Sequence, residues 1–174
     1  VTGSTITAVV IEDAAGTTAV TDMNATQAAN VTIDALAGAA TLGIKNASNV
    51  GQQDTLNITV SDGDSTGSEA IAGTGNLTTT GIETINITAT DDITLDAMTG
   101  MTGIQSLTAT GGGDVSVTSG ALALGTNVGI DFSGLTAATT LNMSAATTNP
   151  FAFTGSATAV DNFTSSGIGG NIIN

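Results

Sequence analysis

The segment 61–69 carries oxygen-bearing side chains at the spacing of half a calcium-binding loop. Three of them alternate along the chain and a glycine follows, in the order Asp62, Asp64, Thr66 and Gly67. A hard cation needs several converging oxygen ligands, and a glycine permits the sharp turn that gathers them. The twelfth loop position falls on Gly73, so the EF-hand pattern is incomplete, and Glu69 is the substitute ligand that the segment offers. We therefore predict a calcium site here; the alternative is a solvated loop, since Asp, Ser and Gly also favour turns.

Two further acidic positions lie between predicted strands. Asp91 and Asp92 place two like charges at one turn, and Asp114 follows three glycines. A bound cation would relieve the repulsion between adjacent carboxylates, and so would simple exposure to water. We add these three residues to the predicted calcium ligands.

A repeated aliphatic-Asp motif brings in three more carboxylates, at Asp34, Asp96 and Asp131. If the repeats stack, these side chains are expected to form a column that needs cations or hydrogen-bond donors. The alternative is that each Asp forms a turn by accepting hydrogen bonds from its own backbone.

The charge balance excludes several classes of partner. The chain has 15 acidic residues against one basic residue, Lys45, and a formal net charge of −14. No basic patch can form, which argues against nucleic acid as a partner. No apolar stretch approaches the roughly 20 residues that span a bilayer, so membrane insertion is not expected. The N-terminal residues lack the basic start of a signal peptide, and we expect the chain to be a mature or trimmed piece of a larger protein.

Catalysis is not expected. The chain has no histidine and no cysteine, so it lacks a histidine base, a thiolate nucleophile, a zinc site and disulfides. Carboxylate pairs occur in glycosidases, but only four aromatic residues, all Phe, are present to support a sugar. We predict that the protein is not an enzyme.

Most of the chain is predicted to form short strands, because β-branched residues alternate with polar ones between Gly, Asp and Asn turns. Region 1–30 is expected to hold a strand and a short helical or loop segment, with Thr21–Ala29 the best helical candidate; region 31–174 is expected to be repetitive. The expected strands are Ser4–Glu12, Val31–Ile33, Thr41–Ile44, Thr55–Val60, Asn76–Thr78, Thr84–Thr88, Ile93–Leu95, Ser106–Thr110, Val115–Thr118, Val128–Phe132, Thr140–Ser144, Ala152–Thr154 and Asn162–Ser165.

Internal repeats predict the architecture. Asp54–Thr59 and Glu83–Thr88 are near copies, with Thr140–Ser144 as a partial third. Apolar anchors recur about every 22 or 23 residues, or at a larger interval containing Leu141, at Ile85, Leu107, Ile130 and Phe163. One coil per repeat is typical of a solenoid. We predict an all-β fold, an irregular parallel β-solenoid or β-helix, with a β-sandwich as the alternative. The Thr-x-Thr pairs at Thr88–Thr90 and Thr108–Thr110 are too irregular in sequence to predict a flat threonine array like that of ice-binding solenoids.

These repeats resemble bacterial surface-layer (S-layer) proteins of the type I-secreted, RTX-related kind. The resemblance rests on Gly81–Ile87 and on the aliphatic-Asp segments that lead into strands such as Ser106–Thr108. It implies a strand-rich fold, calcium between strands or subunits, and assembly into a lattice on the cell surface. The RTX nonapeptide is absent, and only Gly111–Val117 comes near it.

We therefore expect a structural subunit, or a fragment of one, of an extracellular surface layer or filament. It would self-assemble as a homo-oligomer through β edges and calcium-bridged carboxylates. The alternative is a secreted adhesin or glycan-binding module that recognises a cell-surface glycan. Its binding patch would have to use Phe132, Phe151 and Phe153, the available aromatic material.

Overall fold

A computed structural model describes residues 6–14, 16–36, 38–49, 51–61, 76–95, 101–117, 128–144, 151–164 and 172–174. These residues form short strands and one four-residue helix. The elements are β1 (Val9–Ala14), β2 (Thr18–Met23), α1 (Ala25–Ala28), β3 (Val31–Leu36), β4 (Ala39–Ile44), β5 (Thr55–Val60), β6 (Asn76–Thr80), β7 (Thr84–Ala89), β8 (Ile93–Leu95), β9 (Met101–Thr102), β10 (Ser106–Gly111), β11 (Val115–Val117), β12 (Val128–Leu135), β13 (Thr139–Asn142), β14 (Phe151–Thr154), β15 (Asn162–Thr164) and β16 (Ile172–Ile173).

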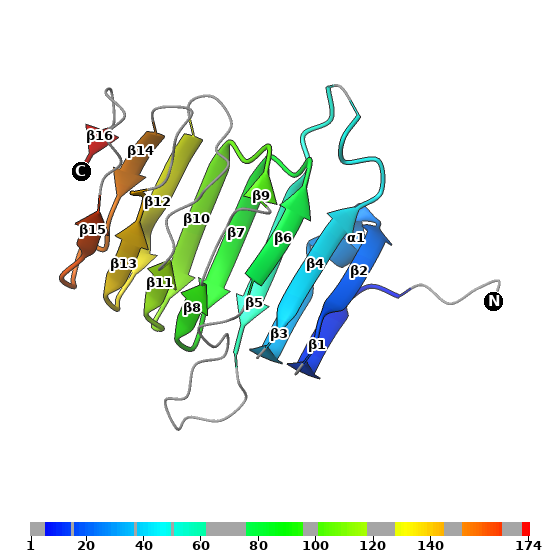
Figure 1. The fold of residues 1–174 in the computed structure, drawn as a ribbon, viewed down its shortest axis with the longest axis horizontal. Helices are drawn as coiled ribbons and strands as arrows, with labels where there is room; N and C mark the ends of the chain where they lie inside the picture. The colour runs from blue at the N-terminus through cyan, green and yellow to red at the C-terminus, as the bar shows by residue number, and fades with distance from the viewer. Residues whose placement is uncertain are drawn as a thin grey trace.

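The strands make three sheets that follow one another around a common core (Figure 1). One sheet, which we call the long sheet, has the order β1-β3-β5-β7-β10-β12-β14-β16 and runs the whole length of the stack. The second, β2-β4-β6-β9, accompanies its N-terminal part, and the third, β8-β11-β13-β15, accompanies its C-terminal part. Every strand pairing among the described residues is parallel. Parallel pairing between successive coils defines a β-solenoid and excludes the antiparallel sandwich.

The repeats predicted from sequence stack directly on one another in the long sheet. Strand β5 pairs with β7 over six consecutive residues, with Leu56 opposite Ile85. Strand β10 continues the same register, which places Leu107 beside Ile85. The buried residues alternate with more exposed ones along β5 and β7, as expected for strands with one face in the core. The third copy of the repeat is therefore Ser106–Thr110.

Two residue positions that were matched between repeats from the sequence are not equivalent in the structure. The partial copy Thr140–Ser144 contributes to β13, which belongs to a different sheet from β5 and β7. The anchor after Ile130 is Phe153, its partner in the β12–β14 pairing, and not Phe163, which lies in β15. Both errors have one cause: each coil contributes strands to more than one sheet, so apolar residues recur more often than once per coil.

The core consists mainly of Ile, Leu, Val and Ala, and its aromatic residues gather at the C-terminal end. The Phe132 and Phe153 rings meet edge to face with centroids 5.8 Å apart, and Phe153 stacks on Phe163 at 5.2 Å. Such ring pairs add about 0.5–1.5 kcal/mol beyond the area that they bury. Aliphatic rows thus fill most coils, and the phenylalanines close the last ones.

Glycines at the corner after β10 allow the coils to approach closely. A Cβ atom on Gly111 would collide with the carbonyl oxygen of Ala89, and one on Gly113 would collide with that of Asp91. Gly111 also has a φ of 121°, which an L side chain rarely adopts. Close coil stacking therefore accounts for the glycine run that partly resembles an RTX repeat.

The N-terminal region enters the same sheets. Strand β1 pairs with β3, and β2 pairs with β4, so the described part of the solenoid includes residues from Val9 onward. Part of the expected helical segment is strand β2, and the helix itself is limited to α1. Asn24 and Gln27 cap it reciprocally, each side chain accepting from the backbone N–H of the other at 3.0 and 2.9 Å.

Candidate functional sites at the corners and end coils

Carboxylates at the predicted corners join successive coils. Asp91 and Asp92 follow β7, and Asp114 follows β10 in the next coil. The Asp114 backbone N–H donates to Oδ1 of Asp92 at 2.8 Å, and the Ala138 N–H donates to Oδ1 of Asp114 at 2.9 Å. Oδ1 of Asp91 accepts from the N–H of Asp92 at 2.8 Å. Each corner carboxylate thus caps the backbone of an adjoining turn, and Asp92 and Asp114 do so from one coil to the next.

These acidic residues have backbone partners and also lie beside a hollow. One oxygen of each carboxylate accepts from a backbone N–H, which belongs to the next residue for Asp91 and to the next coil for Asp92 and Asp114. A hollow of about 300 Å³ beside them is lined by Asp92 and Asp114 together with Thr94, Ser116 and Thr140. Carboxylate and hydroxyl oxygens are ligand types that suit Ca²⁺, yet no three acidic side chains converge as a metal-binding group in the described ranges. The calcium assignment of this corner stays a prediction.

The other predicted ligands are distributed differently. Asp62, Asp64, Thr66 and Glu69 lie outside the described residues, as does Asp96. Asp34 lies opposite Glu12 in the β1–β3 pairing, whereas Asp131 lies opposite Thr108 in the β10–β12 pairing. When the register is followed from β3 through β5, β7 and β10 to β12, Asp34 and Asp131 are not at equivalent positions of the long sheet. The predicted column joining Asp34 and Asp131 was therefore wrong.

Asp131 instead has a local partner. The side chain and backbone N–H of Ser133 donate to its carboxylate, the backbone bond being 3.0 Å long, and they hold the pKa of Asp131 below its ordinary value. A short Asx-type turn of this kind stabilises the charged form without a cation.

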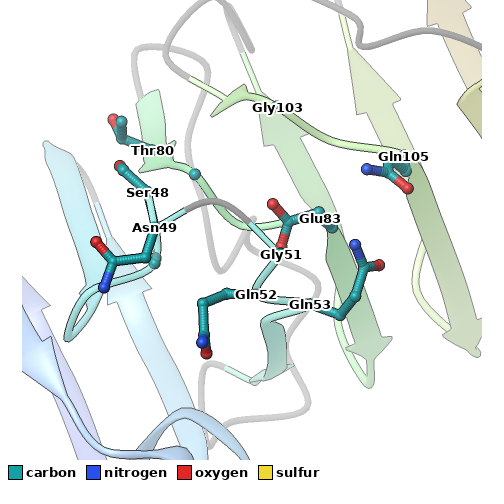
Figure 2. A pocket seen from close by; sticks show the side chains of 11 residues that line it. Ser48, Asn49, Gly51, Gln52, Gln53, Thr80, Glu83, Gly103 and Gln105 are labelled. Carbon is teal, nitrogen blue, oxygen red and sulfur yellow. The ribbon is translucent and has the colours of Figure 1, made fainter.

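A second hollow lies at the corner where the chain enters the long sheet (Figure 2). It has a volume of about 460 Å³ and is lined mostly by amide, hydroxyl and glycine residues, with Glu83 as its acidic member. Oε2 of Glu83 accepts from the Asp54 N–H at 2.8 Å, so an acid again caps the backbone of a neighbouring coil, here the preceding one. Oδ2 of Asp54 is buried without a hydrogen-bond partner.

This hollow was not predicted from the sequence, although a repeated acid indicates its corner. Asp54 and Glu83 occupy the same position in the two near copies of the repeat, immediately before paired strands. An acid repeated at a strand entry indicates a second capping corner. The amides around it come from segments without a repeat pattern, so their convergence depends on the fold.

Exposed apolar side chains are confined to the two ends of the solenoid. Among the described residues, the exposed large hydrophobic side chains are Ile6, Val10, Val160, Ile172 and Ile173. Val10 belongs to β1 and the last two form β16, which are the edge strands of the long sheet and lie at opposite ends of the stack (Figure 1). In the intervening coils, the large apolar side chains that the structure describes are not exposed.

The phenylalanines do not form the binding patch expected of a glycan-binding module. Phe132, Phe151 and Phe153 expose only 1–3% of their surface, because they fill the interior of the C-terminal coils. The adhesin alternative thus loses the aromatic surface on which it depended.

The fold and its corners define a parallel β-solenoid whose coils are joined by carboxylate caps. Comparison with protein-family models, curated proteins and solved structures finds no match. The helix found in the described part of the chain, α1, has four residues and is far too short to cross a bilayer.

Proposed function

We propose that this chain is a structural subunit, or part of one, of an extracellular surface layer or filament, and that it has no catalytic role. The observation that carries the proposal concerns the described residues: their exposed large apolar side chains lie in the first and last described coils, at the edge strands of the long sheet. An exposed apolar edge strand is a template for pairing with another chain.

The parallel sheet sets the geometry of assembly. Because all strands of the long sheet run in one direction, a second copy can extend it in parallel only by placing its β1 beside β16 of the first. This contact joins two different surfaces, and repeating it produces an open filament rather than a closed ring. Backbone hydrogen bonds would then continue across the junction as they do between coils.

Calcium would act against charge repulsion. A net charge of −14 on every copy opposes end-to-end contact, and divalent cations at the corner carboxylates would reduce that repulsion. The hollow beside Asp92 and Asp114, with hydroxyl groups around it, supports this role.

Electron microscopy and light scattering of the purified chain test the proposal in calcium, in magnesium and in a chelator. We expect filaments or sheets in calcium and dispersal in the chelator. The double substitution Ile172→Lys with Ile173→Lys should abolish assembly by placing charges on the β16 edge. Thr59→Lys with Thr88→Lys is the matched control, since it adds the same charge at exposed positions on the side of the solenoid.

Two results would overturn the proposal. Dispersed monomers of the wild-type chain in every condition would exclude self-assembly as its function. Assembly of the β16 variant as efficiently as the control would exclude the end-to-end edge contact.

A further inference from the structure

The outward face of the long sheet carries hydroxyl and amide side chains in regular rows. Four consecutive strands or strand starts present an Asn or Thr, a buried residue and a Thr: Asn30–Thr32, Asn57–Thr59, Asn86–Thr88 and Thr108–Thr110. A further row consists of Thr55, Thr84 and Ser106. The sequence did not predict this regularity, because the spacing between the copies varies; strand register restores it.

The rows form a two-dimensional lattice. Strands β5, β7 and β10 pair over six residues each without a register shift. Neighbouring strands lie about 4.8 Å apart, and alternate residues along a strand are separated by about 6.6 Å. The array therefore repeats at nearly constant intervals in both directions over three coils.

Hydrogen bonds between coils fix the central row. Nδ2 of Asn86 donates to Oδ1 of Asn57 at 2.8 Å, and Oγ1 of Thr108 donates to Oδ1 of Asn86 at 2.7 Å. The side chains of this row are thus held in one orientation before any ligand arrives, which lowers the entropy cost of binding. Next to them, Thr59, Thr88 and Thr110 are exposed.

The array is neutral in a strongly acidic protein. Strands β5, β7 and β10 contain no charged residue, although the chain as a whole has a net charge of −14. The neutral array ends at β12, where the exposed Asp131 lies opposite Thr108. A shallow hollow of about 460 Å³ lies along the rows and is lined by Asn57, Thr59, Asn86 and Thr88, among others. Its described lining contains no aromatic residue that could stack on a sugar ring.

We propose that this array is an ice-binding surface. Like an ice surface, the array repeats in two directions at intervals of several ångströms, and its hydroxyl and amide groups can replace water molecules in a surface layer. The threonine methyl groups supply apolar contact, and the absence of charge avoids the strongly held hydration shells that would disrupt an ordered layer. A neutral polysaccharide is less suited to the array, because sugar sites depend on aromatic platforms that this face lacks.

The proposal is tested by thermal hysteresis and by incorporation of the fluorescently labelled chain into a slowly growing ice hemisphere. We expect the wild-type chain to enter the ice and to shape its crystals. Thr88→Tyr should reduce incorporation to the level of serum albumin, because a ring in the exposed row would hold the array away from the ice. Thr164→Tyr, the same substitution at an exposed position on the third sheet, is the matched control and should retain incorporation. Circular dichroism establishes that both variants are folded.

Exclusion of the wild-type chain from ice, or equal incorporation of Thr88→Tyr and the wild type, would overturn the proposal. Binding of the wild-type chain to neutral polysaccharides without entry into ice, lost in Thr88→Tyr, would also overturn it and assign the face to sugar. The measurements use the dispersed monomer in a chelator, so failure of the filament proposal leaves this test unaffected.

Discussion

Replacing Asp92 by alanine should destabilise the fold through one hydrogen bond between coils. The substitution removes the carboxylate oxygen that accepts from the Asp114 N–H at 2.8 Å. It leaves that N–H without its protein partner at the corner where β10 leads into β11. Asp92→Asn keeps an oxygen acceptor at the same position and removes the charge.

The partial exposure of the corner sets the magnitude. A hydrogen bond to a charged group is worth about 1.5–3 kcal/mol when the group left behind stays buried. Asp92 is half-buried and Asp114 is exposed, so water can reach the orphaned N–H. The loss of a helix N-cap, about 0.5–2 kcal/mol, is the closer comparison. We expect Asp92→Ala to cost about 1 kcal/mol, which lowers Tm by about 2–4 °C for a chain of this length.

The assay is thermal unfolding followed by circular dichroism, first in a chelator and then with calcium. Glu12→Ala, at an exposed acid on β1, controls for the loss of one negative charge. In the chelator, Asp92→Asn should unfold close to the wild type and Asp92→Ala below it. If calcium binds this corner, it should raise the wild-type Tm and have less effect on either Asp92 variant. An unchanged Tm for Asp92→Ala, or equal losses for both substitutions, would refute the capping argument.

Two further predictions concern the corner after β10 and the turn after Asp131. Gly113→Ala should destabilise the chain by about 1–3 kcal/mol, because its Cβ would collide with the carbonyl oxygen of Asp91; wild-type stability in urea unfolding would contradict the close approach. The pKa of Asp131, measured by carboxyl NMR titration, should lie below the ordinary aspartate value and should rise in Ser133→Ala. Because the folded pKa is the lower one, the stabilisation is complete above the unfolded pKa and is lost as the pH falls through the folded pKa; a pKa unchanged by Ser133→Ala would contradict the role of the hydroxyl.

The sequence predicted the strands best where the chain alternates strictly. The bounds of β5 and β8 agree with the expected Thr55–Val60 and Ile93–Leu95. Strand β2 was missed. Of its residues Thr18–Met23, only Met23 is fully buried, so the strand lacks a clear alternation of core-facing and exposed residues. Its strand conformation depends on pairing with β4, and its register shifts between Val20 and Met23. Such a strand is determined by its neighbour rather than by its own residues.

The candidate site was predicted in part. The sequence placed Asp92 and Asp114 at turns between predicted strands, and their hydrogen bond shows that these turns lie on successive coils. The wrong column of Asp34 and Asp131 arose because similar motifs can occupy different rows of one sheet. The acid repeated at Asp54 and Glu83 signals the second corner, but the amide lining of its hollow could not be predicted, since it comes from non-repeating turns that only the coil path brings together.

The ladder of Asn57, Asn86 and Thr108 implies that coil length and strand register vary independently. Asn57 and Asn86 are 29 residues apart, whereas Asn86 and Thr108 are 22 apart, yet all three meet in one row. The longer coil costs less than about 0.6 kcal/mol of closure entropy, the cost of a full doubling in length. Insertions between strands are therefore nearly neutral for stability, while an insertion within a strand shifts every side chain beyond it. Evolution of such a chain is free to change its corners and is constrained to conserve its strands.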